Sequence, residues 1–180
     1  MKLAKNIILN TDSYKVSMFK QYPVGTTGVY SYIESRGGKY DATVMFGLQA
    51  FIKEFLLQPV TQQDIEVADK ILTSHGVPFN REGWEYIVNK LGGKLPVRIR
   101  AVPEGTVVPV SNVLVTIENT DPECFWLTTW LETALLRAVW YGTTVATQSY
   151  KIKKVISEYL DKTGDPSGID FKLHDFGARG

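Results

Sequence analysis

Residues 124–142 read CFWLTTWLETALLRAVWYG and form the most apolar stretch of this 180-residue chain. Glu132 and Arg137 interrupt the stretch, so it lacks the roughly 18 consecutive apolar residues that a transmembrane helix requires. The stretch therefore predicts a helix buried in a globular core. Residues 120–123, TDPE, are typical of a helix start, because they place a proline at an early helical position and an acid in the first turn. Gly142 predicts the end of this helix.

A second helix is predicted directly after Gly142, over residues 143–160. Its Val, Ile and Tyr side chains fall on one helical face and its lysines fall on another. Residues 161–168, DKTGDPSG, are predicted to form a loop because of their glycines and proline. Residues 169–177, IDFKLHDFG, have the pattern of a strand that runs into a turn.

The part of the chain before the apolar stretch predicts an antiparallel sheet. Residues 95–120 are rich in Val and Ile and contain turn signals at 103–105 and 111–112, so they predict two or three antiparallel strands. Residues 28–35, GVYSYIES, alternate aromatic and small residues and predict another strand.

Shorter helices are expected around these strands. Helical apolar spacing, N-cap residues and terminal glycines or prolines predict helices over residues 11–23, 44–57, 61–76 and 80–92. The tryptophans fall at helical positions and are expected to fill the core: Trp84, Trp126, Trp130 and Trp140. Helices and antiparallel strands are segregated along the chain, so the predicted class is α+β, with a final strand that could begin a β/α section.

Composition excludes several classes of protein. Hydrophobic residues make up 44% and charged residues 22% of the chain, as in globular domains. The net charge is +1 and no Lys/Arg block stands apart from acids, so we expect no nucleic-acid partner. The chain has a single cysteine, Cys124, which excludes an internal disulfide framework and is consistent with the cytoplasm. We expect Cys124 to be a small buried side chain. The apolar run Ile7–Leu9 is too short for a signal peptide, and we expect no membrane partner.

The strongest candidate for chemistry is the cluster at residues 173–180, LHDFGARG. His174 could be a general base oriented by Asp175, but adjacent strand residues point to opposite faces, and a structural histidine is the alternative. Phe176 falls where α/β folds bind ligands, at the carboxyl end of the predicted strand, or it packs in the core. Arg179, between two small residues, suits a phosphate or carboxylate, or it is a surface charge.

Two further candidates lie near the N-terminus. In TDSYK, residues 11–15, Asp12 is a helix N-cap or a site acid, and Tyr14 either presents a flat ring to a ligand or packs. In ESRGG, residues 34–38, Arg36 precedes two glycines and either binds phosphate or is a solvated turn residue. The sequence contains no zinc-ligand spacing, Walker loop or G-x-G-x-x-G motif.

Several long stretches together resemble the nicotinamide phosphoribosyltransferase family, in the same order along the chain. These stretches are NTDSYKVSMFKQYP (10–23), VYSYIESR (29–36), VMFGLQAFI (44–52), VPEGTVVPVSNVLVTIENTDPECFWLTTWLET (102–133) and FKLHDFGARG (171–180). The nicotinate phosphoribosyltransferases are the nearest relatives of that family. TDSYK together with ENTDPE favours the nicotinamide branch, so nicotinate is the less favoured substrate.

The resemblance implies a reaction and its partners. The family joins nicotinamide to phosphoribosyl pyrophosphate and gives nicotinamide mononucleotide and pyrophosphate, a salvage step toward NAD. Mg²⁺ accompanies phosphoribosyl pyrophosphate, and ATP hydrolysis is coupled through a phosphorylated histidine. The family enzymes are homodimers.

The resemblance also assigns roles to individual residues. Phe176 matches the aromatic residue on one face of the pyridine ring, and Tyr14 matches the aromatic residue on the other face, supplied by the partner subunit. Arg179 matches an arginine near the carboxamide and phosphates. Arg36 matches a phosphate-contacting arginine from the partner subunit, and Asp12 matches an acid close to the tyrosine.

The implied domain organisation divides the chain unequally. Residues 1–160 correspond to an N-terminal α+β domain and residues 161–180 to the first strand of an α/β barrel. Family members continue beyond the matched residues with the rest of the barrel, the carboxamide-binding acid, the phosphorylated histidine and further phosphate-binding segments. We therefore expect the 180 residues alone to be inactive. The alternatives are one half of a split enzyme and a non-catalytic remnant that keeps the first domain.

Overall fold

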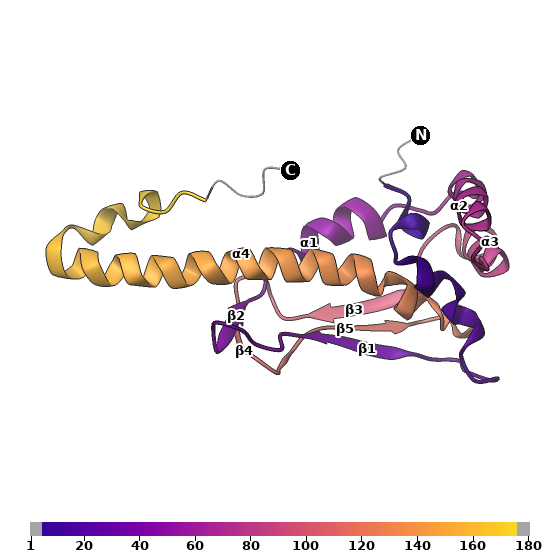
Figure 1. Cartoon of the computed structure of the whole chain (residues 1–180), viewed down its shortest axis with the longest axis horizontal. Coiled ribbons are helices and arrows are strands. Elements are labelled where there is room, and N and C mark those ends of the chain that lie inside the picture. Colours follow the sequence, from indigo (N-terminus) through magenta and orange to yellow (C-terminus); the bar gives the residue numbers. More distant parts are fainter. Residues whose placement is uncertain (1–4, 176–180) are drawn as a thin grey trace.

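A long helix organises the chain, whose structure is a computed structural model that describes residues 5–175. Helix α4, Leu127–Thr163, runs through 37 residues. It lies along the three-stranded sheet and contacts β1 (Tyr30–Glu34), β2 (Ala42–Val44) and β5 (Val113–Asn119). In Figure 1 the sheet lies on one side of α4 and helix α1 on the other. The predicted α+β class is confirmed.

The strands form two antiparallel sheets. In the larger sheet the order is β1-β5-β3, with β3 at Val97–Ala101. Ile117 of β5 lies opposite Ser31 of β1 and Ile99 of β3. The smaller sheet pairs β2 with β4, Val107–Pro109. The strands predicted over residues 28–35 and 95–120 are therefore confirmed.

Shorter helices surround this sheet and α4. Helix α1, Leu48–Phe51, continues as a π-helical turn over Ile52–Leu56. Helices α2, Gln62–Ser74, and α3, Arg81–Leu91, pack against each other. The remaining helical segments are 3₁₀ helices at Ile7–Leu9, Ser13–Lys20, Pro122–Cys124 and Pro166–Phe171.

The predicted helix ends of α2 and α3 are confirmed by their hydrogen bonds. Thr61 and Asp64 form a capping box, in which each side chain accepts from the backbone N–H of the other residue. Asn80 Oδ1 accepts from the N–H of Gly83 at 3.2 Å. Gly92 ends α3 in the left-handed region at φ 62°, which glycine adopts at low cost.

The core is centred on three of the four tryptophans. Trp84, Trp126 and Trp130 meet edge to face, with ring centroids 5.1–5.5 Å apart, and all three are buried. Trp140 was expected to join them, but 67% of its surface is exposed, because it lies about 100° around α4 from buried Val139, outside the buried stripe. In residues 5–175 no helix is long and apolar enough to cross a membrane.

The expected helix end at Gly142 is wrong, because α4 passes through it without a break. A Cβ at this position would lie 2.6 Å from the carbonyl oxygen of Phe46 and 3.1 Å from Cα of Gly47. The glycine therefore permits a close approach between α4 and the chain that enters α1. A glycine used for packing inside a helix has the same sequence signature as a glycine that ends one.

The strand predicted over residues 169–177 is absent as far as Asp175, and its last two residues lie outside the described part. Pro166–Phe171 instead form a 3₁₀ helix. The carboxylate of Asp165 accepts from the N–H of Ser167 at 2.9 Å, and Pro166 is in the first turn. These local signals stabilise a helical turn, whereas a strand needs a hydrogen-bonded neighbour, which residues 5–175 do not place beside it.

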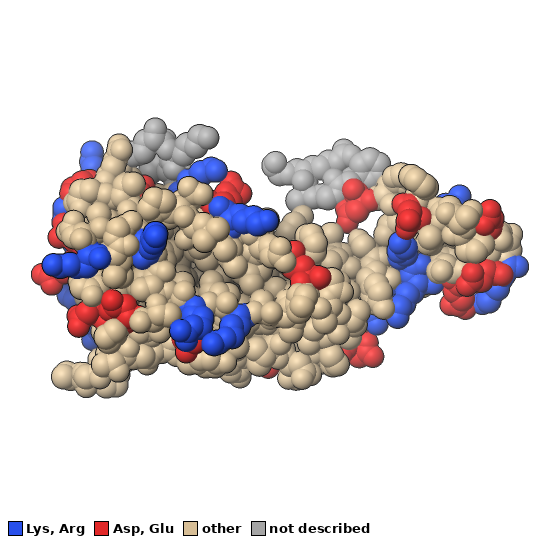
Figure 2. All heavy atoms as spheres, turned by 180° about the vertical axis from the view of Figure 1, so that it is seen from behind, with Lys and Arg blue, Asp and Glu red and all other residues tan. Residues whose placement is uncertain are grey.

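Charged side chains of both signs are interspersed on the face of the molecule shown in Figure 2. Uncharged residues cover much of its middle. Arg98 and Arg100 share Glu118 across the sheet, with both contacts at 3.0 Å. Arg81 is paired with three acids, Glu66, Asp69 and Glu85. These basic groups are engaged within the fold.

Replacing Gly142 with alanine should destabilise the chain, although alanine is the better helix former. We expect a loss of about 1–3 kcal/mol in the free energy of unfolding, because the added methyl group presses against backbone atoms that cannot rotate away. Urea denaturation measures this loss. Gly168→Ala is the control, because its Cβ would meet only Lys172 Cε at 3.7 Å, an ordinary contact. Equal stability of both variants would contradict the packing role of Gly142.

Cys124 should be unreactive in the folded chain. It is fully buried, and burial, followed by the charges of Asp121 and Glu123, raises the pKa of its thiol to about 12. Since the thiolate is the reactive form, labelling by a disulfide reagent at pH 8 should be at least roughly 1000-fold slower than in the unfolded chain. The labelling rate should rise with pH as the thiol approaches its pKa. Rapid stoichiometric labelling of the native chain would contradict this.

Candidate functional site

The TDSYK motif, residues 11–15, leads into a 3₁₀ helix, Ser13–Lys20, that is packed against the start of α4. Lys15 and Val16 of this helix are buried, whereas 61% of the surface of Tyr14 is exposed. The segment therefore buries Lys15 and Val16 and presents the tyrosine ring to solvent. An exposed ring on a buried base can stack on a flat ligand without disturbing the core.

Three side chains attach this segment to a single turn of α4. Thr11 Oγ1 donates to the carbonyl oxygen of Trp130 at 2.8 Å, and Thr133 Oγ1 donates to Asp12 Oδ2 at 2.7 Å. Lys15 Nζ forms an ion pair with Glu132. Of the two predictions for Asp12, helix N-cap or site acid, the structure places it at the N-cap position, but its side chain makes no capping hydrogen bond and contacts α4 instead.

Lys15 is the most buried charged side chain of the described residues, at 3% exposed. Burial, the largest influence, lowers the pKa of its ammonium group, but the interactions with Glu132 and Tyr14 outweigh burial and raise the pKa above the usual lysine value. The group is therefore charged at neutral pH. Its Nζ lies 4.9 Å from the centroid of the Tyr14 ring, within cation–π range.

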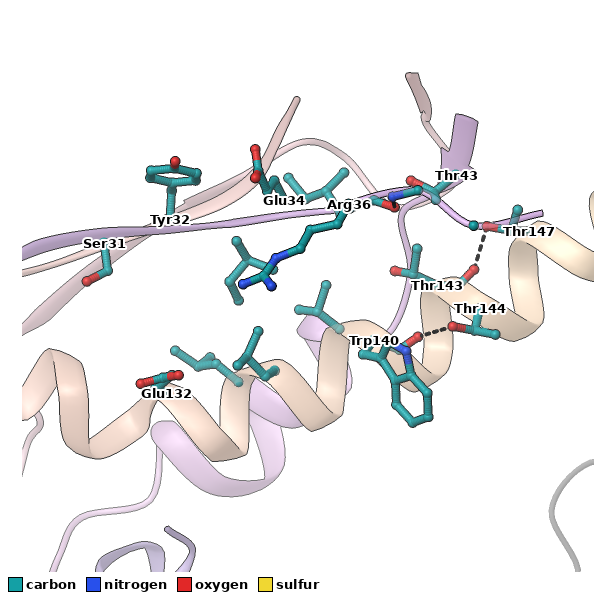
Figure 3. A pocket seen from close by; sticks show the side chains of 18 of the residues that line it. Ser31, Tyr32, Glu34, Arg36, Thr43, Glu132, Trp140, Thr143, Thr144 and Thr147 are labelled. Carbon is teal, nitrogen blue, oxygen red and sulfur yellow. Dashed lines mark hydrogen bonds between the residues drawn. The ribbon is translucent and has the colours of Figure 1, made fainter. Parts of the chain in front are cut away.

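Arg36 lies on the turn after β1, beside a pocket of about 960 Å³ between β1 and α4. Figure 3 shows its side chain extending into this space, whereas Tyr32 and Glu34 point to the other face of the strand. Gly37, at φ 95°, adopts the backbone conformation that the turn requires. The turn therefore aims a guanidinium group into an open pocket, where it can bind an anionic group.

Glu132 links the segment that carries Tyr14 to the pocket that Arg36 enters. Its carboxylate pairs with Lys15 beneath Tyr14, and the same residue lines the pocket that Arg36 enters. Further along α4, the pocket is lined by Trp140, Thr143, Thr144 and Thr147. Sequence reasoning treated Glu132 only as an interruption of the apolar stretch. Its isolation as the one acid among apolar neighbours was the available signal.

The remaining predicted site residues are only partly placed. Phe176 and Arg179 lie outside the described residues, so their assigned roles remain predictions. His174 is exposed, and its Nε2 lies 3.0 Å from the carbonyl oxygen of Phe171. Residues 5–175 gather no group of three or more His, Cys, Asp or Glu side chains that could hold a metal ion. The structure thus brings Asp12, Tyr14 and Arg36 to the first half of α4. It does not test the roles predicted for Phe176 and Arg179.

Comparisons with known proteins agree on one family. Residues 6–99, more than half of the chain, match the family model described as the nicotinamide phosphoribosyltransferase N-terminal domain. A protein of Xanthomonas campestris named nicotinamide phosphoribosyltransferase is 56% identical over the whole chain, and the match covers 39% of that relative. A protein of the same name from Acinetobacter baylyi is 32% identical over 94% of the chain and 37% of its own length.

A solved structure shows the same fold at lower similarity. The crystal structure of human nicotinic acid phosphoribosyltransferase matches 82% of this chain and 28% of its own with a TM-score of 0.56, at 19% sequence identity. The fold and sequence thus define the N-terminal part of a phosphoribosyltransferase. The chain belongs to the nicotinamide phosphoribosyltransferase family and spans about two fifths of the length of the curated relatives described above.

Removing the Tyr14 side chain should cost little stability. Because the ring is mostly exposed, Tyr14→Ala should change the free energy of unfolding by less than about 0.5 kcal/mol. Val16→Ala, two residues further on and fully buried, should cost about 2 kcal/mol and serves as the control for this segment. Thermal or urea unfolding of the two variants measures both values. A Tyr14→Ala cost equal to that of Val16→Ala would show that the ring is a core residue.

Proposed function

We propose that the chain forms the N-terminal part of a nicotinamide phosphoribosyltransferase of the cytoplasm. Such an enzyme transfers the phosphoribosyl group of phosphoribosyl pyrophosphate to nicotinamide and releases pyrophosphate, and the resulting mononucleotide is used in NAD salvage. The observation that supports this most directly is the exposed ring of Tyr14 held on a buried polar base, in a chain of this family.

The chemistry explains why a flat ring and a guanidinium group are needed. The pyridine nitrogen forms a bond to the anomeric carbon of the ribose, and the carbon–oxygen bond to pyrophosphate breaks, with the electron pair leaving on pyrophosphate. The protein must hold the pyridine ring in line with that carbon and stabilise the departing negative charge. Tyr14 would stack on the pyridine, and Arg36 would bind a phosphate group.

The other groups complete this arrangement in the proposal. Phe176 would cover the opposite face of the pyridine, and Arg179 would contact the carboxamide or the phosphates. Tyr14 and Arg36 would act in the site of a partner subunit, so a homodimer would contain two such shared sites. Asp12 would hold the tyrosine segment on α4 through Thr133. Mg²⁺ would enter with phosphoribosyl pyrophosphate, and ATP coupling would use a histidine outside the residues matched here.

We propose that catalysis also needs residues that correspond to the rest of the relatives' length, from the same polypeptide or a second chain. A direct test joins this chain to the residues that follow the matched region in the Xanthomonas campestris relative, which is 56% identical to it. The 180 residues alone should make no nicotinamide mononucleotide, whereas the chimeric enzyme should make it from nicotinamide and phosphoribosyl pyrophosphate with Mg²⁺. Nicotinate should be the poorer substrate.

In this chimeric enzyme Tyr14→Ala should raise the KM for nicotinamide about tenfold, because one stacking face is lost. Tyr14→Phe keeps the ring and should remain within about twofold of the unaltered enzyme. Tyr159→Ala is the matched control, since this tyrosine on the distal part of α4 is equally exposed at 61%. Both KM and kcat are measured by product formation.

Two outcomes would contradict the proposal. A folded chimeric enzyme that makes no product, assayed beside the active relative, would contradict the function. An active chimeric enzyme in which Tyr14→Ala leaves the KM for nicotinamide unchanged would contradict the role of Tyr14.

A further inference from the structure

We infer that the ion pair between Lys15 and Glu132 positions the ring of Tyr14 for its ligand. The inference rests on the proposed function, because it takes Tyr14 as the residue that stacks on nicotinamide. Lys15 and Glu132 would be positioning residues, which act through Tyr14 and do not touch the substrate. The pair links the 3₁₀ helix Ser13–Lys20 to α4 at the base of the exposed ring.

The placement of Lys15 is the first observation. It directly follows Tyr14 in the chain, its ammonium group lies 4.9 Å from the ring centroid, and its side chain is 3% exposed. A fixed charge at this distance interacts with the face of an aromatic ring and favours one orientation of it. The ring itself is mostly in solvent, so groups at its base decide its orientation.

The asymmetry of the pair is the second observation. Lys15 is buried, but the Glu132 side chain is 47% exposed and borders the pocket beside Arg36. Removing Glu132 would leave a buried ammonium group without its carboxylate, which is costly. Removing Lys15 would leave a carboxylate that water can still solvate. The two single changes should therefore differ in stability, although both release the ring.

The neighbouring contacts explain why the effect should fall on the ring and not on the fold. Thr11 and Asp12 bond to Trp130 and Thr133 of the same turn of α4, and Val16 is buried in the core. The backbone of the segment therefore keeps several attachments when the ion pair is lost. What changes is the charge beneath the ring.

The chain contains an exposed counterpart of this arrangement that provides a matched control. Lys162 pairs with Glu158 at 2.7 Å, and its Nζ lies 5.4 Å from the ring centroid of Tyr159. All three residues are on the exposed distal part of α4. Lys162→Met therefore removes the same three-group arrangement at a surface location away from Tyr14.

The first test reads the ring directly in this chain. 3-Fluorotyrosine is incorporated at position 14, and its ¹⁹F resonance is compared in the unaltered chain and in the Lys15→Met, Glu132→Gln and Lys162→Met variants. We expect Lys15→Met and Glu132→Gln to move the resonance toward that of the unfolded chain, and Lys162→Met to leave it unchanged. Unchanged resonances in both Lys15→Met and Glu132→Gln would overturn the inference.

The second test uses the chimeric enzyme and separates positioning from stability. Lys15→Met should raise the KM for nicotinamide about three- to tenfold, with at most the effect of Tyr14→Ala and with kcat changed less than about twofold. Glu132→Gln should lower the melting temperature more than Lys15→Met does. The double variant Lys15→Met/Glu132→Gln should recover stability but keep the raised KM, since no buried charge then remains unpaired.

The outcomes distinguish this inference from the proposed function. If Tyr14→Ala raises the KM but Lys15→Met only lowers the melting temperature, the pair is structural and the inference is wrong. If the ¹⁹F resonance responds to Lys15→Met but Tyr14→Ala leaves the KM unchanged, the pair orients the ring, and the ligand assigned to Tyr14 is wrong.

Discussion

The burial of the first half of α4 is the constraint on which the rest of the described structure depends. Leu127, Trp130, Leu131, Leu135 and Val139 are all buried on this helix. A fully buried side chain of this kind contributes about 1.5–3 kcal/mol relative to an exposed one, so this face fixes the rotation of the helix against its neighbours. Once that rotation is set, the direction of the side chains on the adjacent face is also fixed.

The candidate site uses that adjacent face. Because a helix turns every 3.6 residues, Glu132 and Thr133 lie beside the buried stripe and reach the N-terminal segment that carries Tyr14. About three turns further on, Thr143 Oγ1 donates to the carbonyl oxygen of Phe46. One turn beyond it, Thr147 Oγ1 accepts from the backbone N–H of Val44. The apolar core therefore positions polar groups that make no contribution to hydrophobic burial themselves.

Sequence reasoning succeeded where structure is local. The Thr61–Asp64 capping box, the Asn80 cap and the strands over residues 28–35 and 95–120 depend on a few neighbouring residues or on a simple alternation. Sequence reasoning failed where a contact with a residue distant in the chain determines the local structure. Gly142 continues a helix because the backbone of Phe46 packs against it, and no property of the surrounding sequence shows that contact.

The sequence nominates residues for the candidate site but does not indicate how they are arranged. Family resemblance indicated Tyr14, Arg36 and Asp12, but the residues that hold them were not recognised. Lys15 reads as an ordinary surface lysine in a short polar motif, and only its ion pair with Glu132, 117 positions away, explains its burial. Phe176 and Arg179 stay predictions because they lie outside the described residues.

The arrangement also makes both parts of the candidate site depend on the position of α4. Tyr14 and Arg36 are 22 positions apart on different elements, and Glu132 of α4 pairs with the Lys15 next to Tyr14 and lines the pocket that Arg36 enters. A shift of α4 along its axis would displace Glu132, and with it the ion pair next to Tyr14 and one wall of the arginine pocket. The rigid core tryptophans at the start of α4 oppose such a shift, so the packing that stabilises the fold also keeps the two candidate groups in register.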